Sequence, residues 1–151
     1  MKFLTKAKDG GSNSPVDAYF LFEIKGLMSI ALLKFNKGER ENYHTHAFDA
    51  LTWFLWGDLV EERVNYLDKS VTKTSYKRSI LPKFTRKDNL HRVVSNKTSW
   101  CFTVRGKWDN MWTEYNNAND ETHLISCGRV LEKTVEGLHM VDEIGGKKWH
   151  I

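Results

Sequence analysis

The chain of 151 residues has little of what marks disordered or repetitive proteins, because it contains only two prolines and ten glycines. It also lacks an internal repeat and a sustained helical period of 3.6 residues. Hydrophobic residues make up 40% of the chain and aromatic residues 13%, which is enough to build a core. We therefore expect one folded domain.

Cysteine is scarce, and membrane-type sequence is absent. Cys101 and Cys127 are the two cysteines, and they form no CxxC pair. Both lie in apolar or β-branched runs, which predicts buried thiols in a reducing compartment, with a bridge between them as the alternative. No stretch approaches the ~20 apolar residues of a membrane helix, and the N-terminus lacks the apolar core of a signal peptide. We expect a cytoplasmic protein without a membrane partner.

The sequence also lacks an excess of charge of one sign. Its 23 basic and 19 acidic residues are interspersed, giving a net charge of +4 and a pI of about 9.0. This balance permits an anionic ligand. The basic loop at residues 83–89 has no cluster of exposed aromatic side chains beside it, as a stacking platform would require. Nucleic-acid binding is therefore the least favoured function.

Short apolar and β-branched runs recur between turn signals every 8–12 residues or so, which predicts an all-β barrel or sandwich. A hairpin turn is expected at Gly57 and Asp58. Residues 1–18 are expected to form an arm and loop, residues 19–134 the barrel, and residues 135–151 an irregular tail. The predicted strands are residues 19–24, 27–35, 44–56, 59–66, 74–81, 93–94, 100–104 and 111–115, with weaker elements at 122–127 and 129–134.

Two histidines one residue apart, His44 and His46, open an aromatic run. Alternate side chains of an extended strand share a face, so both imidazoles could hold one metal ion. A third ligand must come from elsewhere, and His91 is the best candidate. Imidazole suits iron, zinc, nickel, copper and manganese. The alternative is that these histidines are surface or hydrogen-bonding residues, since such pairs also occur by chance.

A small barrel can hold one ligand among its inward-facing side chains. Arg105, at the end of a predicted strand, is the best single candidate for an anion contact. The candidate aromatic lining is Phe48, Phe54, Trp56, Trp100 and Phe102. Core packing is the alternative role for each of these rings.

The spacing of Gly38, His44, His46 and Gly57 resembles the first conserved motif of the cupin superfamily. That motif runs glycine, five residues, HxH, three or four residues, glutamate, six residues, glycine. The resemblance covers roughly residues 18–115. It implies a double-stranded β-helix, or jelly-roll barrel, with a divalent transition metal such as Fe, Mn, Ni or Zn.

The second cupin motif has a proline, a glycine, a histidine and then an asparagine. It is matched loosely here by Pro82, His91 and Asn96. By resemblance, His91 takes the third histidine position beside His44 and His46.

One departure concerns the glutamate ligand, because Ala50 stands where cupins usually carry it. Three interpretations remain open: a three-histidine site, as in some cupin dioxygenases acting on thiols; Asp49 entering through a bulge; or loss of the metal. Glu61 and Glu62 follow on the return strand. They are expected on a solvated face, with one facing inwards as the alternative.

The resemblance implies a metal-dependent enzyme of oxygenase or isomerase type that acts on a small molecule. The alternative is a non-enzymatic barrel that binds or sequesters a small ligand or a host partner, such as a phage accessory protein. The missing glutamate favours this second hypothesis. A homodimer formed through strand edges is also implied by the resemblance.

Overall fold

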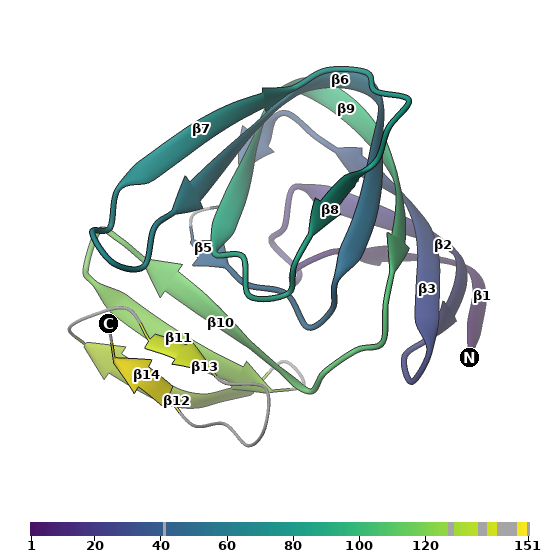
Figure 1. The fold of residues 1–151 in the computed structure, drawn as a ribbon. Helices are drawn as coiled ribbons and strands as arrows, with labels where there is room; N and C mark the ends of the chain where they lie inside the picture. The colour runs from purple at the N-terminus through teal and green to yellow at the C-terminus, as the bar shows by residue number, and fades with distance from the viewer. Residues whose placement is uncertain (41, 127–128, 136–138, 142–147, 151) are drawn as a thin grey trace.

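A computed structural model describes residues 1–40, 42–126, 129–135, 139–141 and 148–150. Every regular element in these ranges is a β-strand, so the all-β prediction is confirmed. Twelve strands form one sheet that curls into a barrel, and β13 (His139–Val141) pairs with β14 (Lys148–His150) in a separate two-stranded sheet (Figure 1). The twelve strands are β1 (Lys2–Lys8), β2 (Val16–Ile24), β3 (Met28–Phe35), β4 (Gly38–Glu39), β5 (Tyr43–His44), β6 (Ala50–Val64), β7 (Val71–Tyr76), β8 (Lys83–Thr85), β9 (His91–Arg105), β10 (Met111–Asn116), β11 (Glu121–Ser126) and β12 (Arg129–Val135).

Strands β6 and β9 form the frame of the barrel. They are 15 residues long each and run antiparallel, from the Ala50–Arg105 pair to the Arg63–His91 pair. The C-terminal half of β9 also pairs with β3, and its N-terminal half pairs with β4 and β5. β6 pairs with β8 near its start and with β7 along its C-terminal half, so each long strand has different partners along its length as it curves around the barrel (Figure 1).

The predicted hairpin at Gly57 is wrong, because β6 continues through this residue. Gly57 has φ +125°, and a Cβ built on it would lie 2.0 Å from Ser99 Oγ. The glycine is needed here for a bend within the strand and for close contact with β9, rather than for a hairpin turn. Likewise, the strands predicted at 93–94 and 100–104 are parts of one strand, β9.

The walls enclose a buried apolar cluster. It consists of Val16, Ala18, Phe20, Ala31, Leu33, Leu59 and Cys101. Its members come from β2, β3, β6 and β9, where alternate side chains point inwards. Burial raises the pKa of the Cys101 thiol to about 12. Cys101 is a free thiol, as expected for a buried structural cysteine, while Cys127 lies outside the described residues.

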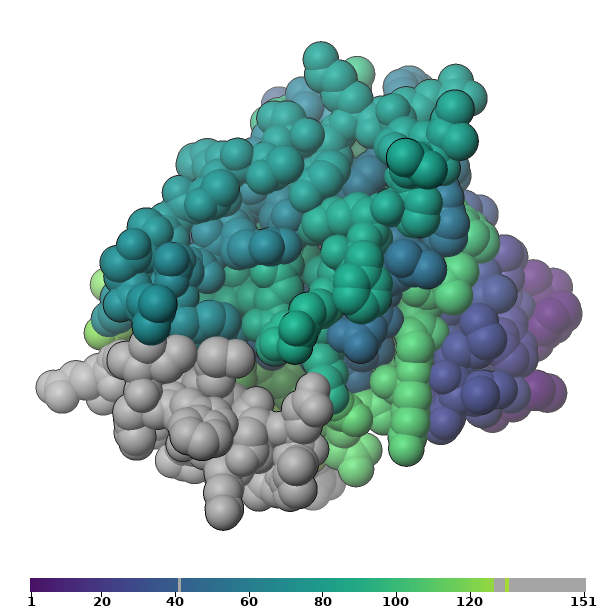
Figure 2. Space-filling view, viewed as in Figure 1, coloured from purple at the N-terminus to yellow at the C-terminus, as the bar shows by residue number. Residues whose placement is uncertain are grey.

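Both ends of the chain differ from the expectation. Residues 2–8 were expected in an arm, but they form β1, which pairs with β2 from Lys2–Glu23 to Lys8–Asp17. Lysines on this exposed strand form ion pairs with β2, an arrangement typical of an edge strand. Within the tail expected to be irregular, β13 and β14 are strands. In the space-filling view, β1 to β3 form one flank, and the segment from β6 to β8 covers much of the near side (Figure 2).

Candidate metal centre and cavity

Three histidines meet at one end of the β5–β9 pair. His44 lies opposite His91 in the register, and His46 follows β5 by two residues. Their potential ligand atoms all lie within 4.8 Å of one another. His46 Nε2 is 2.7 Å from His91 Nε2. The backbone N–H of His46 donates to the carbonyl of Lys87 at 2.8 Å, which holds the segment after β5 in place.

The three imidazoles are neutral at pH 7. Burial, followed by the charge of Arg40, holds the pKa of His44 well below its usual 6.5. Burial and the neighbouring His91 do the same for the pKa of His46. Burial also lowers the pKa of His91, against the opposing influence of Glu61. Neutral imidazoles keep a nitrogen lone pair free, which is the form that binds metals.

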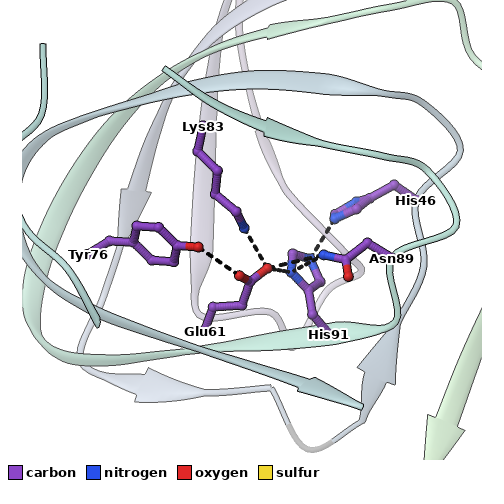
Figure 3. Close-up of polar contacts among 6 residues, drawn as sticks. All are labelled: His46, Glu61, Tyr76, Lys83, Asn89 and His91. Atoms are coloured by element: carbon purple, nitrogen blue, oxygen red, sulfur yellow. Dashed lines mark hydrogen bonds and ion pairs between the residues drawn. The ribbon is translucent and has the colours of Figure 1, made fainter. Parts of the chain in front are cut away.

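A buried carboxylate orients the third histidine (Figure 3). His91 Nδ1 donates to Glu61 Oε1. Glu61 is only 3% exposed. It also accepts from Tyr76 Oη at 3.0 Å, Lys83 Nζ at 2.5 Å and Asn89 Nδ2 at 3.2 Å. Because Nδ1 carries the proton, His91 Nε2 presents its lone pair towards His46.

Glu61 stays ionised among these donors. Burial alone raises the pKa of its carboxyl group, but the hydrogen bond from His91 and the charge and hydrogen bond of Lys83 bring that pKa well below its ordinary value. Burial in turn lowers the pKa of Lys83 and raises that of Tyr76. The result is a compact polar network directly behind the histidine cluster.

A cavity of about 110 Å³ lies beside the cluster. Its polar lining includes the three histidines, Glu61, Tyr76, Lys83, Arg40, Arg105 and Asp9. Its apolar lining includes Val16, Leu33, Phe35, Phe54, Leu59 and Cys101. A second cavity of about 340 Å³ shares Asp9, Arg40, His44, His46 and Phe48 with the first and extends to Trp108 and Trp112. The cluster is therefore accessible to a small ligand.

Three of the six predicted lining residues lie at the cavity, namely Phe48, Phe54 and Arg105. The other three do not. Trp56 is 66% exposed, because register shifts on both sides of it interrupt the alternation of β6. Trp100 stacks on Tyr19 at 5.7 Å, away from the cavity.

Phe102 likewise faces away from the cavity and packs against Trp53 at 5.6 Å. The inward side chains of β9 are Cys101, Thr103 and Arg105, each at most 2% exposed. Trp100 and Phe102 were expected to face inwards, but the inward residues of β9 are their neighbours in the sequence. A shift of one residue in the inward-outward alternation exchanges the two faces of a strand.

Asp49 is not part of the cluster. It is exposed, and its carboxylate accepts the backbone N–H of Lys87 at 2.7 Å. Ala50, at the position expected for a glutamate ligand, is buried and lines the cavity. No carboxylate joins the group of three histidines within the described residues.

Sequence reasoning gave too little weight to Glu61 and missed Tyr76 and Lys83 as its partners. The signal for Glu61 was the pair Glu61–Glu62 itself, because neighbouring residues in a strand point to opposite faces. One of the two therefore had to face inwards. Both are in fact buried, at 3% and 5% exposed.

Comparison with solved structures supports the fold. A sugar phosphate isomerase of the cupin superfamily from Silicibacter pomeroyi matches with a TM-score of 0.52 and 15% identity, covering 81% of this chain and 77% of that one. An Fe(II) HppE structure matches with a TM-score of 0.52 and 10% identity over 67% of this chain and 55% of its own. A variant of oxalate decarboxylase from Bacillus subtilis matches with a TM-score of 0.51 and 10% identity, over 70% and 28% of the two chains. The chain has the cupin fold.

The predicted cupin jelly roll is thus confirmed at the level of fold. The matches to HppE and oxalate decarboxylase span little more than half and about a quarter of those chains. No protein-family model matches the sequence of this chain, and the search of curated proteins finds no match. The comparisons give no support to a phage origin. Within the described residues, the chain has no helix that could span a membrane.

Proposed function

We propose that this cupin binds a divalent transition metal through His44, His46 and His91 and acts on a small molecule. The observation that carries the proposal is the meeting of three neutral imidazoles at the wall of a cavity, with His91 oriented by a buried carboxylate. Metal-binding histidines commonly donate their second N–H to a carboxylate in this way.

The donor set fits such an ion. Three nitrogen ligands suit iron, manganese, nickel or zinc and leave coordination positions open for a substrate. His44 Nδ1 is also buried without a hydrogen-bond partner in the described part of the chain. A buried polar atom of this kind is costly unless it is satisfied, and a metal ligand role for the ring accounts for its desolvated position.

A bound metal would supply Lewis-acid or redox chemistry at these open positions. The apolar side chains of the cavity lining would limit the access of water, and Lys83 and Tyr76 donate to Glu61 within the same cavity. This arrangement is compatible with both oxygenase and isomerase chemistry. One of the similar folds is that of a sugar phosphate isomerase.

The test is the metal content of untagged protein, measured by mass spectrometry for the wild type, His44→Ala and His91→Ala. We expect near-stoichiometric Fe, Mn, Ni or Zn in the wild type and its loss in both variants. His123→Ala is a matched control, because His123 is a half-buried histidine outside the cluster. A wild type that takes up no metal after reconstitution, while all variants remain folded, would contradict the proposal.

A second candidate function is a non-enzymatic barrel that binds or sequesters a small ligand. It is favoured by Ala50, which lines the cavity where cupins usually carry a glutamate ligand. The same measurement separates the two, since only the first requires a metal. Cytoplasmic localisation, a host partner and a homodimer remain predictions.

A further inference from the structure

A buried arginine lies in the cavity wall, close to the histidine cluster. Arg105 is 2% exposed, and its guanidinium lies 4.7 Å from the Phe48 ring and 5.7 Å from the Phe20 ring. The ring of His46 is 5.4 Å from the same Phe48 ring. A small molecule bound at Arg105 would therefore be close to the three histidines.

The acidic partner of Arg105 comes from a different part of the chain. Asp9 follows β1, and its carboxylate accepts from Arg105 Nη1 at 3.2 Å and Nη2 at 2.6 Å. The two side chains differ in burial, with 3% exposed for Arg105 and 29% for Asp9. The arginine is thus fixed in the wall, while the carboxylate reaches it from the side of the solvent.

The loop that carries Asp9 borders both cavities. Asp9 lines both cavities, and Gly10 and Gly11 line the larger one. Gly10 has φ +95°, and a Cβ there would lie 2.5 Å from Arg40 Nη1. The glycine therefore allows this loop to pack tightly against Arg40, which places the Asp9 carboxylate against Arg105.

The other cations of the cavity have carboxylate partners that are more deeply placed. Lys83 pairs with Glu61, which is 4% exposed as a side chain, and Arg40 pairs with Glu114 at 2.9 Å. Glu61 also holds His91, so a ligand cannot replace it without disrupting the cluster. Among these three carboxylates, Asp9 is the one that a ligand can displace with the least disturbance of the residues around the cavity.

We propose that Arg105 binds the carboxylate of a small acid with an apolar tail, and that Asp9 occupies this position when the ligand is absent. A guanidinium forms two parallel hydrogen bonds with a carboxylate, as it does here with Asp9. The apolar tail would lie against Val16, Leu33 and Phe35. A cavity of about 110 Å³ limits that tail to a few carbons or one ring.

This inference names the substrate class of the proposed function and rests on it for the reaction, but the carboxylate site itself requires no metal. The experiment is a titration of hexanoate into the full chain, with and without a chelator, followed by calorimetry and by the NMR signal of the Arg105 Nε–H group. Hexanamide, the uncharged analogue, and inorganic phosphate are titrated in parallel.

We expect hexanoate to bind the wild type and to bind Asp9→Asn about tenfold more tightly, because the competing charge-assisted pair is removed. Hexanamide should show no such gain. In the double variant Asp9→Asn with Arg105→Gln, which leaves no unpaired charge in the wall, hexanoate should bind no better than hexanamide. Asp17→Asn is a matched control, because Asp17 pairs with Lys8 across β1 and β2 and does not line the cavity.

Unchanged hexanoate affinity in Asp9→Asn would overturn the inference and make the Asp9–Arg105 pair purely structural. Equal binding of hexanamide, or tighter binding of inorganic phosphate, would overturn it as well. Hexanoate binding that the chelator abolishes would place the carboxylate on the metal, leaving the proposed function intact and this inference wrong. A protein that takes up no metal, yet binds hexanoate more tightly once Asp9 is replaced, would support this inference and contradict the proposed function.

Discussion

Glu61 and Glu62 are adjacent in β6, and both are buried, but they face different surroundings. Glu61 points into the cavity and holds His91, Lys83 and Tyr76. Glu62 accepts from Arg92 Nε at 2.7 Å and Tyr43 Oη at 3.2 Å. The two carboxylates therefore allow the effect of burying a charge to be separated from the effect of orienting a metal ligand.

Replacing Glu61 by glutamine removes the charge and keeps the shape. The amide oxygen of the new side chain can still accept from His91 Nδ1, but the bond is no longer assisted by charge, and Lys83 loses its ionic partner. We expect the affinity for a divalent metal to fall about 10- to 100-fold. The measurement is competition with a chromophoric chelator at pH 7.

Glu62→Gln is the control for this prediction. Glu62 also loses an ion pair, with Lys73 at 2.6 Å, but it does not line the cavity. We expect this variant to lose stability while its metal affinity stays within about twofold of the wild type. Equal losses of metal affinity in the two variants would show that Glu61 does not orient His91.

At the scale of elements, the site depends on the close approach of β6 and β9. The register brings His91 opposite Arg63 at one end and Ala50 opposite Arg105 at the other. Between these ends, Gly57 lies against Ser99, where β6 bends. The same pair of strands thus carries His91 of the cluster and Arg105 of the carboxylate site.

Gly57→Ala tests this bend. The new methyl group would lie 2.0 Å from Ser99 Oγ and 2.5 Å from Ser99 Cα, at a positive φ that a side chain disfavours. We expect the free energy of unfolding to fall by about 2–5 kcal/mol, since backbone strain and overpacking add. Urea denaturation measures the change.

Gly26→Ala is the matched control, because nothing lies within 4 Å of the added Cβ. We expect its free energy of unfolding to stay within about 0.5 kcal/mol of the wild type. If Gly57→Ala were as stable as Gly26→Ala, the close contact between β6 and β9 would not be required for the fold.

At the scale of the whole molecule, the three buried histidines make the fold less stable at acidic pH. The pKa values of His44, His46 and His91 are lower in the folded chain than their usual 6.5. Below that pH, the unfolded chain binds more protons than the folded one, so stability falls as the pH falls. Glu61, whose pKa lies below its usual 4.5, stabilises the fold above pH 4.5 and loses this contribution at lower pH.

We therefore expect the free energy of unfolding of the metal-free protein to decrease between pH 7 and pH 5. Each imidazole contributes up to about 1.4 kcal/mol per pH unit once the pH is below 6.5. The measurement is urea denaturation from pH 8 to pH 5 in the presence of a chelator.

A variant with glutamine at all three histidine positions is the comparison. Its free energy of unfolding should change much less over the same range, because the groups that take up protons on unfolding are gone. An equally steep dependence in this variant would assign the acid sensitivity to other groups.

The class of fold and the members of the histidine cluster could be predicted from the sequence. Both depend on local patterns: short apolar strands between turns, the one-residue spacing of His44 and His46, and the cupin-like arrangement that added His91. The burial of Cys101 followed from its apolar neighbours in the same way. The strands and the His44–His46 pair need only the alternation of side chains along one strand, whereas His91 was assigned by the resemblance.

The inward face of each strand and the meetings of distant residues could be read only from the folded chain. The phase of β9 placed Arg105 in the cavity and Trp100 outside it. The bend at Gly57 took the place of a hairpin, and the loop after β1 brought Asp9 to Arg105. Strand register and close contacts depend on partners far apart in the chain, and a shift of one residue moves every side chain of a strand to the opposite face. Local sequence patterns therefore do not specify them.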